Sequence, residues 1–359
     1  MTMLWMDGFD HYGTGSTGRT NMLTGVYADA DTNATPSTAN PRNGTHSYLA
    51  NNEATGLRRV FGAAKTTVGV GGAFWFNNLP SLAGRTPIMA FLDGDNINQV
   101  ALVLGTDGRL SARRGTIDQL TALTATVLGT STNAVITAGT WHHIECKYVA
   151  SETVGTFTVK VDEVEVLAIT GADTCNTSNI ESSQVLFGRY IDNNVAPAYI
   201  DDIYAWDTAG SYNNDFVGDK DILAYWYTGD GATSAWVRNT GATDYEQVDD
   251  TTQDGDTTYL QAATALDVEE LTLSGVPSTV AGIVAIGLVN CMRKTQAGAS
   301  NVQAAAVETG GAVSSGTDRA MSEEYTYYLD VIERNPAAGT PAWTYTTLNT
   351  MSLRLTRTV

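Results

Sequence analysis

The chain of 359 residues contains few cysteines and few histidines, and these shortages exclude two kinds of stabilised fold. Cys146, Cys175 and Cys291 are too few and too scattered for a disulfide framework, and an odd count leaves at least one thiol unpaired within the chain. We therefore expect folding in a reducing cytoplasm. Of the four histidines, the neighbours His142 and His143 point to opposite faces of an expected strand, and no zinc-type spacing occurs.

Basic side chains are also scarce, because 20 Lys and Arg stand against 39 Asp and Glu and give a formal net charge of -19. This balance argues against nucleic acid as a partner, since phosphate backbones are bound by clustered Lys and Arg. The one compact basic cluster, Arg109, Arg113 and Arg114, is interpreted as solvated surface. Acidity of this size favours a basic or neutral partner surface.

Long apolar runs are absent as well. The longest, at 280–292, is too short and too interrupted by Gly to span a bilayer. The first seven residues have neither a basic region nor an apolar run, so we expect no signal peptide and no membrane insertion.

The chain is instead rich in Gly, with 35 residues, and only 16% of its residues are charged. This composition is typical of many short strands joined by turns, so we predict an all-β fold. At this length two domains are expected. Strand-like runs bounded by Gly, Asn, Asp or Pro occur in the first half at 47–50, 56–61, 67–77, 88–93, 99–105 and 110–114. Their spacing is that of a β-sandwich.

The clearest hairpin lies at 156–169, where apolar and polar residues alternate on both arms around Asp162 and Glu163. Two further strands are expected at 183–190 and 198–207, joined by a turn at Asp192-Asn193-Asn194. By contrast, 13–18 and 29–43 are predicted to be loops flanking one short strand near Val26.

The strand-like pattern gives way to polar, Gly-containing loops after Asp207, and we place a linker at residues 211–232, between domains at 1–210 and 233–359. Residues 219–226 could form a short helix or a strand. The second domain is predicted to be another β-sandwich, and 280–292 is interpreted as a strand buried on both faces. Its expected strands lie at 246–249, 259–262, 268–273, 280–292, 302–308, 325–332, 343–347 and 351–357.

Several short motifs together resemble a class of tailed-phage virion proteins that carry a concanavalin-like (laminin-G-like) jelly roll followed by a second β domain. In the first half the motifs are Asp7-Gly8-Phe9-Asp10-His11-Tyr12, Trp141-His142-His143, Val161-Asp162 and Ile200-Asp201-Asp202-Ile203. In the second half they are Trp236-Val237-Arg238-Asn239, Asp254-Gly255-Asp256-Thr257-Thr258-Tyr259 and Trp343-Thr344. Laminin-G-like hairpins usually turn on Asp-Gly, so the pair Asp162-Glu163 predicts a different two-residue or slightly longer turn here.

Catalytic motifs are not recognised, and we expect a protein that is not an enzyme. A glucanase would need acids spaced two and then three apart on one strand, whereas Glu163 and Glu165 sit at a hairpin tip beside Lys160. The glycines of 13–18 match a dinucleotide fingerprint, but we expect neither the preceding strand nor the following helix that such a site needs. No cofactor is therefore expected.

Two Asp-Gly-Asp turns are weak calcium candidates, because hard cations bind several oxygens. They contain Asp93 with Asp95, and Asp254 with Asp256; neither continues into EF-hand spacing, so turn chemistry is the favoured interpretation. Asp201 and Asp202 are expected to face opposite sides of one strand, so a metal shared between them would need outside ligands.

Aromatic side chains are the candidates for an interface. Tyr225, Trp226 and Tyr227 are consecutive, so at least one ring must face away from the surface that buries the others. Tyr325 and Tyr327, with their neighbour Tyr328, could likewise contact another domain or subunit, or form a platform for a sugar.

Two functional hypotheses remain. The first is a non-enzymatic structural component of a phage virion, at the tail tip or fibre or decorating the head. It would contact other virion proteins and assemble as a homo-oligomer, with three-fold or other cyclic symmetry. The alternative is a carbohydrate-binding module that recognises a host-surface glycan. A glycoside hydrolase is the least favoured reading.

Overall fold

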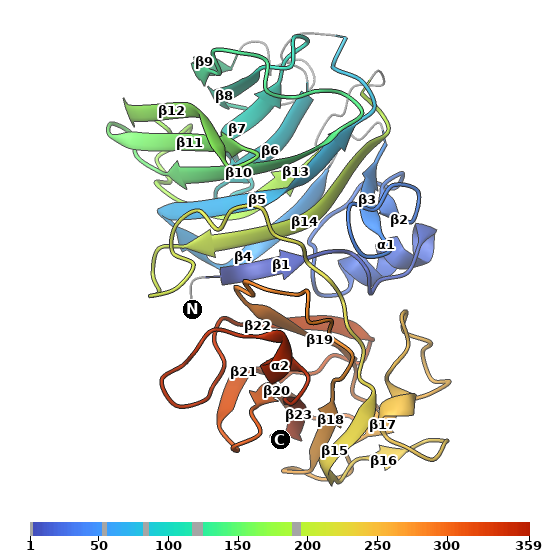
Figure 1. The fold of residues 1–359 in the computed structure, drawn as a ribbon. Helices are drawn as coiled ribbons and strands as arrows, with labels where there is room; N and C mark the ends of the chain where they lie inside the picture. Colours follow the sequence, from blue (N-terminus) through green and yellow to red (C-terminus); the bar gives the residue numbers. More distant parts are fainter. Residues whose placement is uncertain (1–2, 52–55, 82–85, 117–124, 189–194) are drawn as a thin grey trace.

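The computed structural model describes residues 3–51, 56–81, 86–116, 125–188 and 195–359, whose regular elements are mostly antiparallel strands (Figure 1). Two large sheets form the first half of the chain, and smaller sheets form the second half, drawn below them in Figure 1. The prediction of an all-β fold is confirmed. The turn expected at 192–194 lies outside the described residues. In the part of the chain that the structure describes, no helix has the length and apolar character needed to cross a membrane.

The two large sheets stack on each other. The eight-stranded sheet contains, in spatial order, β12 (Val164–Ala172), β11 (Gly155–Val161), β10 (Trp141–Val149), β5 (Thr67–Phe76), β14 (Ala198–Asp207), β3 (Ser47–Ala50) and β2 (Thr35–Ser37), with β1 (Met3–Asp7) also paired to β14. The six-stranded sheet contains β4 (Leu57–Lys65), β13 (Ser182–Phe187), β6 (Thr86–Leu92), β7 (Asn98–Leu104), β8 (Leu110–Arg114) and β9 (Thr126–Thr130).

Aromatic rings fill the core between these sheets. On β10 and β11 the inward positions alternate with polar ones, as period 2 requires, and they place Tyr148 and Phe157 side by side. Phe91 of the opposite sheet packs against both rings, at 5.1 and 5.8 Å between centroids. All three side chains are fully buried, so this cluster holds the two layers together.

The β11–β12 hairpin turns on two residues in the left-handed region, Asp162 with φ 48° and Glu163 with φ 67°. Of the two expected forms, a different two-residue turn or a slightly longer one, the structure has a two-residue turn, and both of its residues have the positive φ that Asp-Gly normally supplies. The Asp162 carboxylate accepts hydrogen bonds from the His143 amide at 2.9 Å and from Nδ1 of His142 at 2.8 Å. These bonds explain how a turn without glycine is held.

The second half is a smaller set of sheets. A five-stranded sheet contains β15 (Gly229–Ser234), β18 (Val268–Thr272), β23 (Ser352–Arg357), β20 (Asn301–Val307) and β21 (Val313–Ala320). Two separate two-stranded sheets accompany it, β19 (Ile286–Met292) with β22 (Thr326–Ile332), and β16 (Val237–Arg238) with β17 (Leu260–Gln261). The division into domains at 1–210 and 233–359 stays a prediction.

The second half packs on the outer face of the eight-stranded sheet. Tyr204 and Trp206 of β14 are buried there with Ala285 and Val331, which belong to the second half. Two glycines of β5 make this possible, because a Cβ on Gly69 or Gly71 would overlap the Trp206 or the Tyr204 ring, respectively. The two glycines of β5 therefore leave a surface without side chains, on which the two aromatic rings pack.

Several expected elements are wrong. The loop predicted at 13–18 is wrong from Gly15 onward, because a helix, α1 (Gly15–Leu23), begins there after β1. A strand and a helix do flank the glycines, contrary to expectation. However, β1 pairs antiparallel with β14, and the next strand, β2, pairs antiparallel with β3, so no parallel βαβ unit is formed.

In the second half, residues 246–249 and 343–347 are not strands, because a 3-10 turn, η1 (Tyr245–Gln247), and a short helix, α2 (Tyr345–Leu348), lie there. The segment 280–292 is a strand only from Ile286, and most of its residues are half-buried. Residues 219–226 are neither helix nor strand.

Candidate functional site

The main cleft of the described residues lies between the layers of the second half and reaches the junction with the first, with a volume of about 1670 Å³. One wall is β19, where Ile286, Leu288, Asn290 and Met292 share a face because side chains two apart point the same way. The opposite wall is the inner face of the five-stranded sheet, with Leu271, Val302, Leu353 and Leu355. The volume exceeds that of typical ligand pockets, about 300–1,000 Å³.

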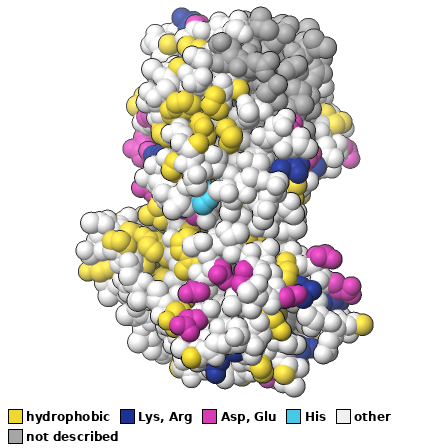
Figure 2. Space-filling view, turned by 90° about the vertical axis from the view of Figure 1, so that its right-hand side faces the viewer, with side chains coloured by type: hydrophobic (Ala, Val, Ile, Leu, Met, Phe, Trp, Pro, Cys, Tyr) yellow, Lys and Arg dark blue, Asp and Glu magenta, His cyan; other side chains and the backbone are white. Residues whose placement is uncertain are grey.

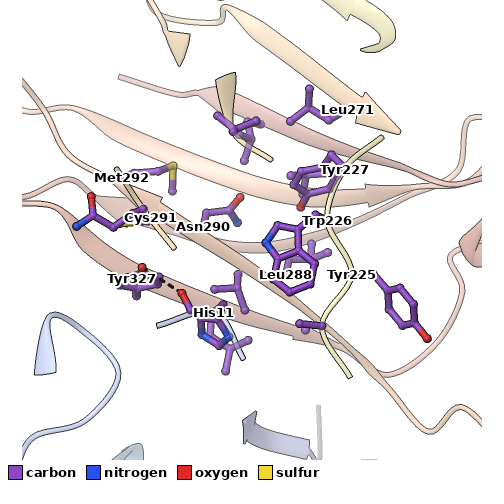
Figure 3. Close-up of a pocket in the computed structure, with 18 of the residues that line it drawn as sticks. His11, Tyr225, Trp226, Tyr227, Leu271, Leu288, Asn290, Cys291, Met292 and Tyr327 are labelled. Carbon is purple, nitrogen blue, oxygen red and sulfur yellow. Dashed lines mark hydrogen bonds between the residues drawn. The ribbon is translucent and has the colours of Figure 1, made fainter. Parts of the chain in front are cut away.

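An aromatic segment borders this cleft. Tyr225, Trp226 and Tyr227 lie on the irregular stretch between the two halves, and all three are half-buried. Nε1 of Trp226 donates to the Asp250 carbonyl at 3.0 Å, which fixes the indole. Tyr225 and Tyr227 pack against the apolar cluster of the second half that includes Leu288, and Figure 3 shows all three side chains of the aromatic segment along the cleft.

Asn290 is the one amide in the apolar row of β19, and its side chain is only 9% exposed. Its Nδ2 has no hydrogen-bond partner among the described residues. A buried donor left without a partner costs about 1–3 kcal/mol, and an acceptor brought by a water molecule or a ligand would remove this cost. In Figure 3 the amide projects from β19 between Met292 and the aromatic segment.

The Asp254-Gly255-Asp256 turn, one of the two calcium candidates, lies at the rim of the cleft, and its carboxylates bind side chains of the protein. Asp256 accepts from Nη2 of Arg293 at 2.6 Å and lies 2.8 Å from the Tyr325 hydroxyl, and the guanidinium lies 4.8 Å from the Tyr325 ring centre. The hydrogen bond from Tyr325 is the main cause of the lowered pKa of Asp256. Asp254 accepts from the Thr258 hydroxyl at 3.0 Å, so both carboxylates hold the turn itself.

The other calcium candidate lies in the β6–β7 turn, far along the chain from the cleft. Asp93 is fully buried and accepts from the amides of Asp95 and Ile97 and from the side chains of Gln99, Thr177 and Asn179. Burial alone would raise its pKa, but these hydrogen bonds lower it. Within the described ranges no group of three or more His, Cys, Asp or Glu is arranged to hold a metal ion.

Tyr327 lies between the two halves of the chain. Its amide donates to the Thr24 carbonyl at 2.7 Å, and its hydroxyl donates to the His11 carbonyl at 3.3 Å, the bond drawn in Figure 3. Its ring packs edge-on against Tyr12 at 5.2 Å. Contact of the aromatic candidates with a second subunit stays a prediction, as does the homo-oligomer.

A charged cluster at the junction was missed by sequence reasoning. β14 has a bulge at Asp202, whose φ is 51°, and both Asp201 and Asp202 are buried. The expectation that they face opposite sides of a regular strand is therefore wrong. Arg42 bridges Asp202 at 3.0 Å and Asp219 at 2.6 Å. Burial raises the pKa of Asp202 to about 6. No signal in the alternation pattern indicates such a bulge.

A second network lies under the segment 215–222, which we call the strap. Glu145 accepts from the amides of Val217 and Gly218 at 2.8 and 3.1 Å, and burial raises its pKa. His143 Nε2 lies 3.0 Å from the Tyr204 hydroxyl, and burial lowers the pKa of His143 to about 4. Since these side chains are almost fully buried beneath the strap, they stabilise the junction.

Comparison with known proteins yields similarity of fold only. No family model matches the chain, and no curated protein does. Among solved structures, the chain is similar to an endo-β-1,4-glucuronan lyase from the fungus Trichoderma reesei, with 14% identity, 48% of this chain and 86% of that chain covered, and a TM-score of 0.34. It is also similar to the alginate lyase Aly36B, with 16% identity, 56% of this chain and 96% of that chain covered, and a TM-score of 0.39. A third similar structure is the carbohydrate-binding module CBM66 from Bacillus subtilis, with 10% identity, 51% of this chain and 97% of that chain covered, and a TM-score of 0.31.

These comparisons correct one expectation. The sequence reading that the chain is not an enzyme is wrong as an exclusion, because polysaccharide lyases stand beside a binding module among the structures that it resembles. At these TM-scores and identities the likeness concerns the fold, and no residue of this chain takes a role from it.

Proposed function

We propose that the chain binds a carbohydrate in the cleft of its second half. The observation that carries this proposal is a cleft of about 1670 Å³ that is lined both by aromatic rings, among them Trp226 and Tyr227, and by the unpartnered amide of Asn290. A sugar ring has apolar C–H faces that pack on aromatic rings and hydroxyls that accept from an amide. The cleft offers both kinds of contact at one place.

Other ligand classes fit less well. A nucleic acid would meet a chain with a formal charge of -19, which repels phosphates. A purely apolar ligand would leave the Nδ2 of Asn290 without an acceptor, and the cost of that buried donor would remain. A neutral molecule with several hydroxyls satisfies the amide and contacts the aromatic rings.

The test begins with the full chain on a broad glycan array and continues with calorimetric titration of the strongest saccharide. The variants Trp226→Ala and Asn290→Ala should each weaken binding by about tenfold, which corresponds to ~1.4 kcal/mol. Matched controls are Tyr212→Ala, an exposed aromatic outside the cleft, and Asn33→Ala, an exposed amide on the first half; both should bind as the parent does. Circular dichroism verifies that each variant is folded.

The proposal fails if no saccharide on the array is bound, or if the cleft variants bind as tightly as the controls. On the resemblance to tailed-phage virion proteins, the glycan would belong to a host surface and the chain to the particle. Mass spectrometry of purified virions tests that location separately from binding.

A further inference from the structure

The acidic side chains on one side of the cleft are not neutralised. Asp250 and Asp254 lie in the connection between η1 and β17 and line the cleft, and neither forms an ion pair in the part of the chain that the structure describes. The Thr258 hydroxyl oxygen lies 3.1 Å from Asp250 and 3.0 Å from Asp254, so the two carboxylates share its single hydrogen and converge on one atom. Burial and the neighbouring carboxylates Asp254 and Asp249 raise the pKa of Asp250.

Of the basic side chains that line the same cleft, two are paired with carboxylates and the others donate hydrogen bonds to main-chain carbonyls. Arg293 is paired with Asp256, and Nζ of Lys294 donates to the Gly298 carbonyl at 2.8 Å. Arg357 donates to the carbonyls of Ala262, Ala263 and Val359. Arg42 is held by Asp202 and Asp219 at the junction. Lys220, which donates to the Asp219 carbonyl, completes the set; the cleft lining carries seven Asp against five Lys and Arg, so its formal charge is negative.

Figure 2 shows acidic side chains on the lower half of the molecule, below the narrow waist between the halves. An anionic ligand that approaches this half meets negative potential from these groups as well as from the chain as a whole. The unpartnered Nδ2 of Asn290 provides an independent sign that the same cleft takes a ligand.

We infer that the cleft selects uncharged saccharides and rejects polyuronates, with Asp250 and Asp254 as the residues that determine this preference. The inference rests on the proposed carbohydrate binding and names the class of sugar. Repulsion between a uronate carboxylate and two carboxylates, neither of which is neutralised by an ion pair, weakens binding of the acidic polymer, while a neutral chain of the same linkage is spared.

The experiment compares pairs of probes that differ only in charge. Cellohexaose, laminarihexaose and mannohexaose are each titrated into the full chain beside the same oligosaccharide oxidised to the uronate at its primary alcohols. We expect at least one neutral probe to bind about tenfold more tightly than its oxidised partner at low salt. The difference should shrink at about 0.5 M salt, because screening shortens the range of the repulsion to a few ångströms.

The double variant Asp250→Asn with Asp254→Asn should reduce the ratio between the dissociation constants of the oxidised and the neutral probe by about tenfold. A control that removes the same charge elsewhere is Asp29→Asn with Asp107→Asn, half-buried and exposed residues of the first half that do not line the cleft, and it should keep the preference. Oxidised probes that bind as well as or better than neutral ones overturn this inference and leave carbohydrate binding intact. Binding of neither set overturns both proposals.

Discussion

At the scale of single residues, the absence of a side chain is as informative as its presence. Gly69 and Gly71 alternate with buried valines on β5 and leave room for the rings of Trp206 and Tyr204. We expect Gly69→Ala to lower the free energy of unfolding by about 1–3 kcal/mol, because the new methyl group must displace a buried indole. Denaturant titration followed by tryptophan fluorescence measures the change.

The control for this substitution is Gly62→Ala on β4, where a Cβ would meet nothing within 4 Å and the backbone needs no positive φ. It should change stability by no more than about 0.5 kcal/mol. Equal losses in both variants would mean that the strand, and not the ring on its surface, is sensitive to the extra methyl.

Period-2 reasoning predicts residue orientation where the backbone is regular and fails where it is not. His142 and His143 face opposite sides of β10 as expected, since His142 pairs with Asp162 and His143 with Tyr204. Asp201 and Asp202 break the rule because the bulge, with Asp202 at φ 51°, brings both carboxylates to Arg42, and alternation carries no sign of a bulge. For the same reason the Arg42 cluster was not foreseen.

At the scale of elements, the β11–β12 hairpin stores strain in its turn. Glu163 occupies φ 67°, where a residue with a Cβ pays about 1 kcal/mol or more and glycine does not. Glu163→Gly should therefore raise the free energy of unfolding by about 0.5–1 kcal/mol, as measured by thermal and denaturant melts.

Glu163→Ala is the matched variant, because it also removes the carboxylate that lies 3.3 Å from the Asp219 amide but keeps a Cβ at positive φ. It should not be stabilised. If alanine and glycine at this position behave alike, the gain would come from the lost carboxylate and the strain argument would be refuted.

A pH-sensitive contact joins β18 to η1. Glu269 is fully buried beside Asp244, and burial raises its pKa to about 7. Asp230 and Arg238 also face Asp244. A folded-state pKa above the unfolded value means that the proton stabilises the fold below about pH 4.5, and that this contribution is lost as pH rises through 7.

Glu269→Gln mimics the protonated acid, since its carbonyl can still accept from the Trp236 amide and its NH2 can donate to Asp244. We expect the variant to match the parent near pH 5 and to be more stable at pH 8. Asp201 and Asp202 also have raised pKa values, so the informative quantity is the difference between parent and variant across pH. A difference that does not vary with pH would contradict the assignment.

The elements that sequence reasoning misplaced share a physical cause. β21 has an exposed, polar sequence and exists because β20 pairs with it, so no apolar alternation marked it. Residues 280–285 are as apolar as a buried strand but line the open cleft without pairing. The cleft depends on this unpaired stretch and on the orientation of Asn290, neither of which local pattern specifies. Tyr225, Trp226 and Tyr227, which the sequence did single out, do border the cleft.

At the scale of the whole molecule, the two halves are joined by more than a covalent linker. The strap lies in the predicted linker, yet its backbone is bound to the first half: Val217 and Gly218 donate to Glu145, and Ile222 donates to Asp202 at 2.7 Å. A chain cut at residue 210 would lose all three bonds, whereas a chain cut at 222 would keep them. The structural boundary of the first half is therefore expected beyond residue 222.

We predict that residues 1–222 fold with a higher melting temperature than residues 1–210. Without the strap, the buried Glu145 keeps only the bond from Trp206 and one more from Tyr204, and the outer face with Tyr204 becomes open to water. The lost hydrogen bonds and the lost burial of the aromatic face both lower the stability of the shorter fragment, and an exposed aromatic patch promotes association. Both fragments lack Val331 and so expose the surface that Val331 covers in the full chain; this loss is the same in both and does not affect the difference between their melting temperatures. Identical melting temperatures and dye binding for the two fragments would show that the strap merely connects the halves.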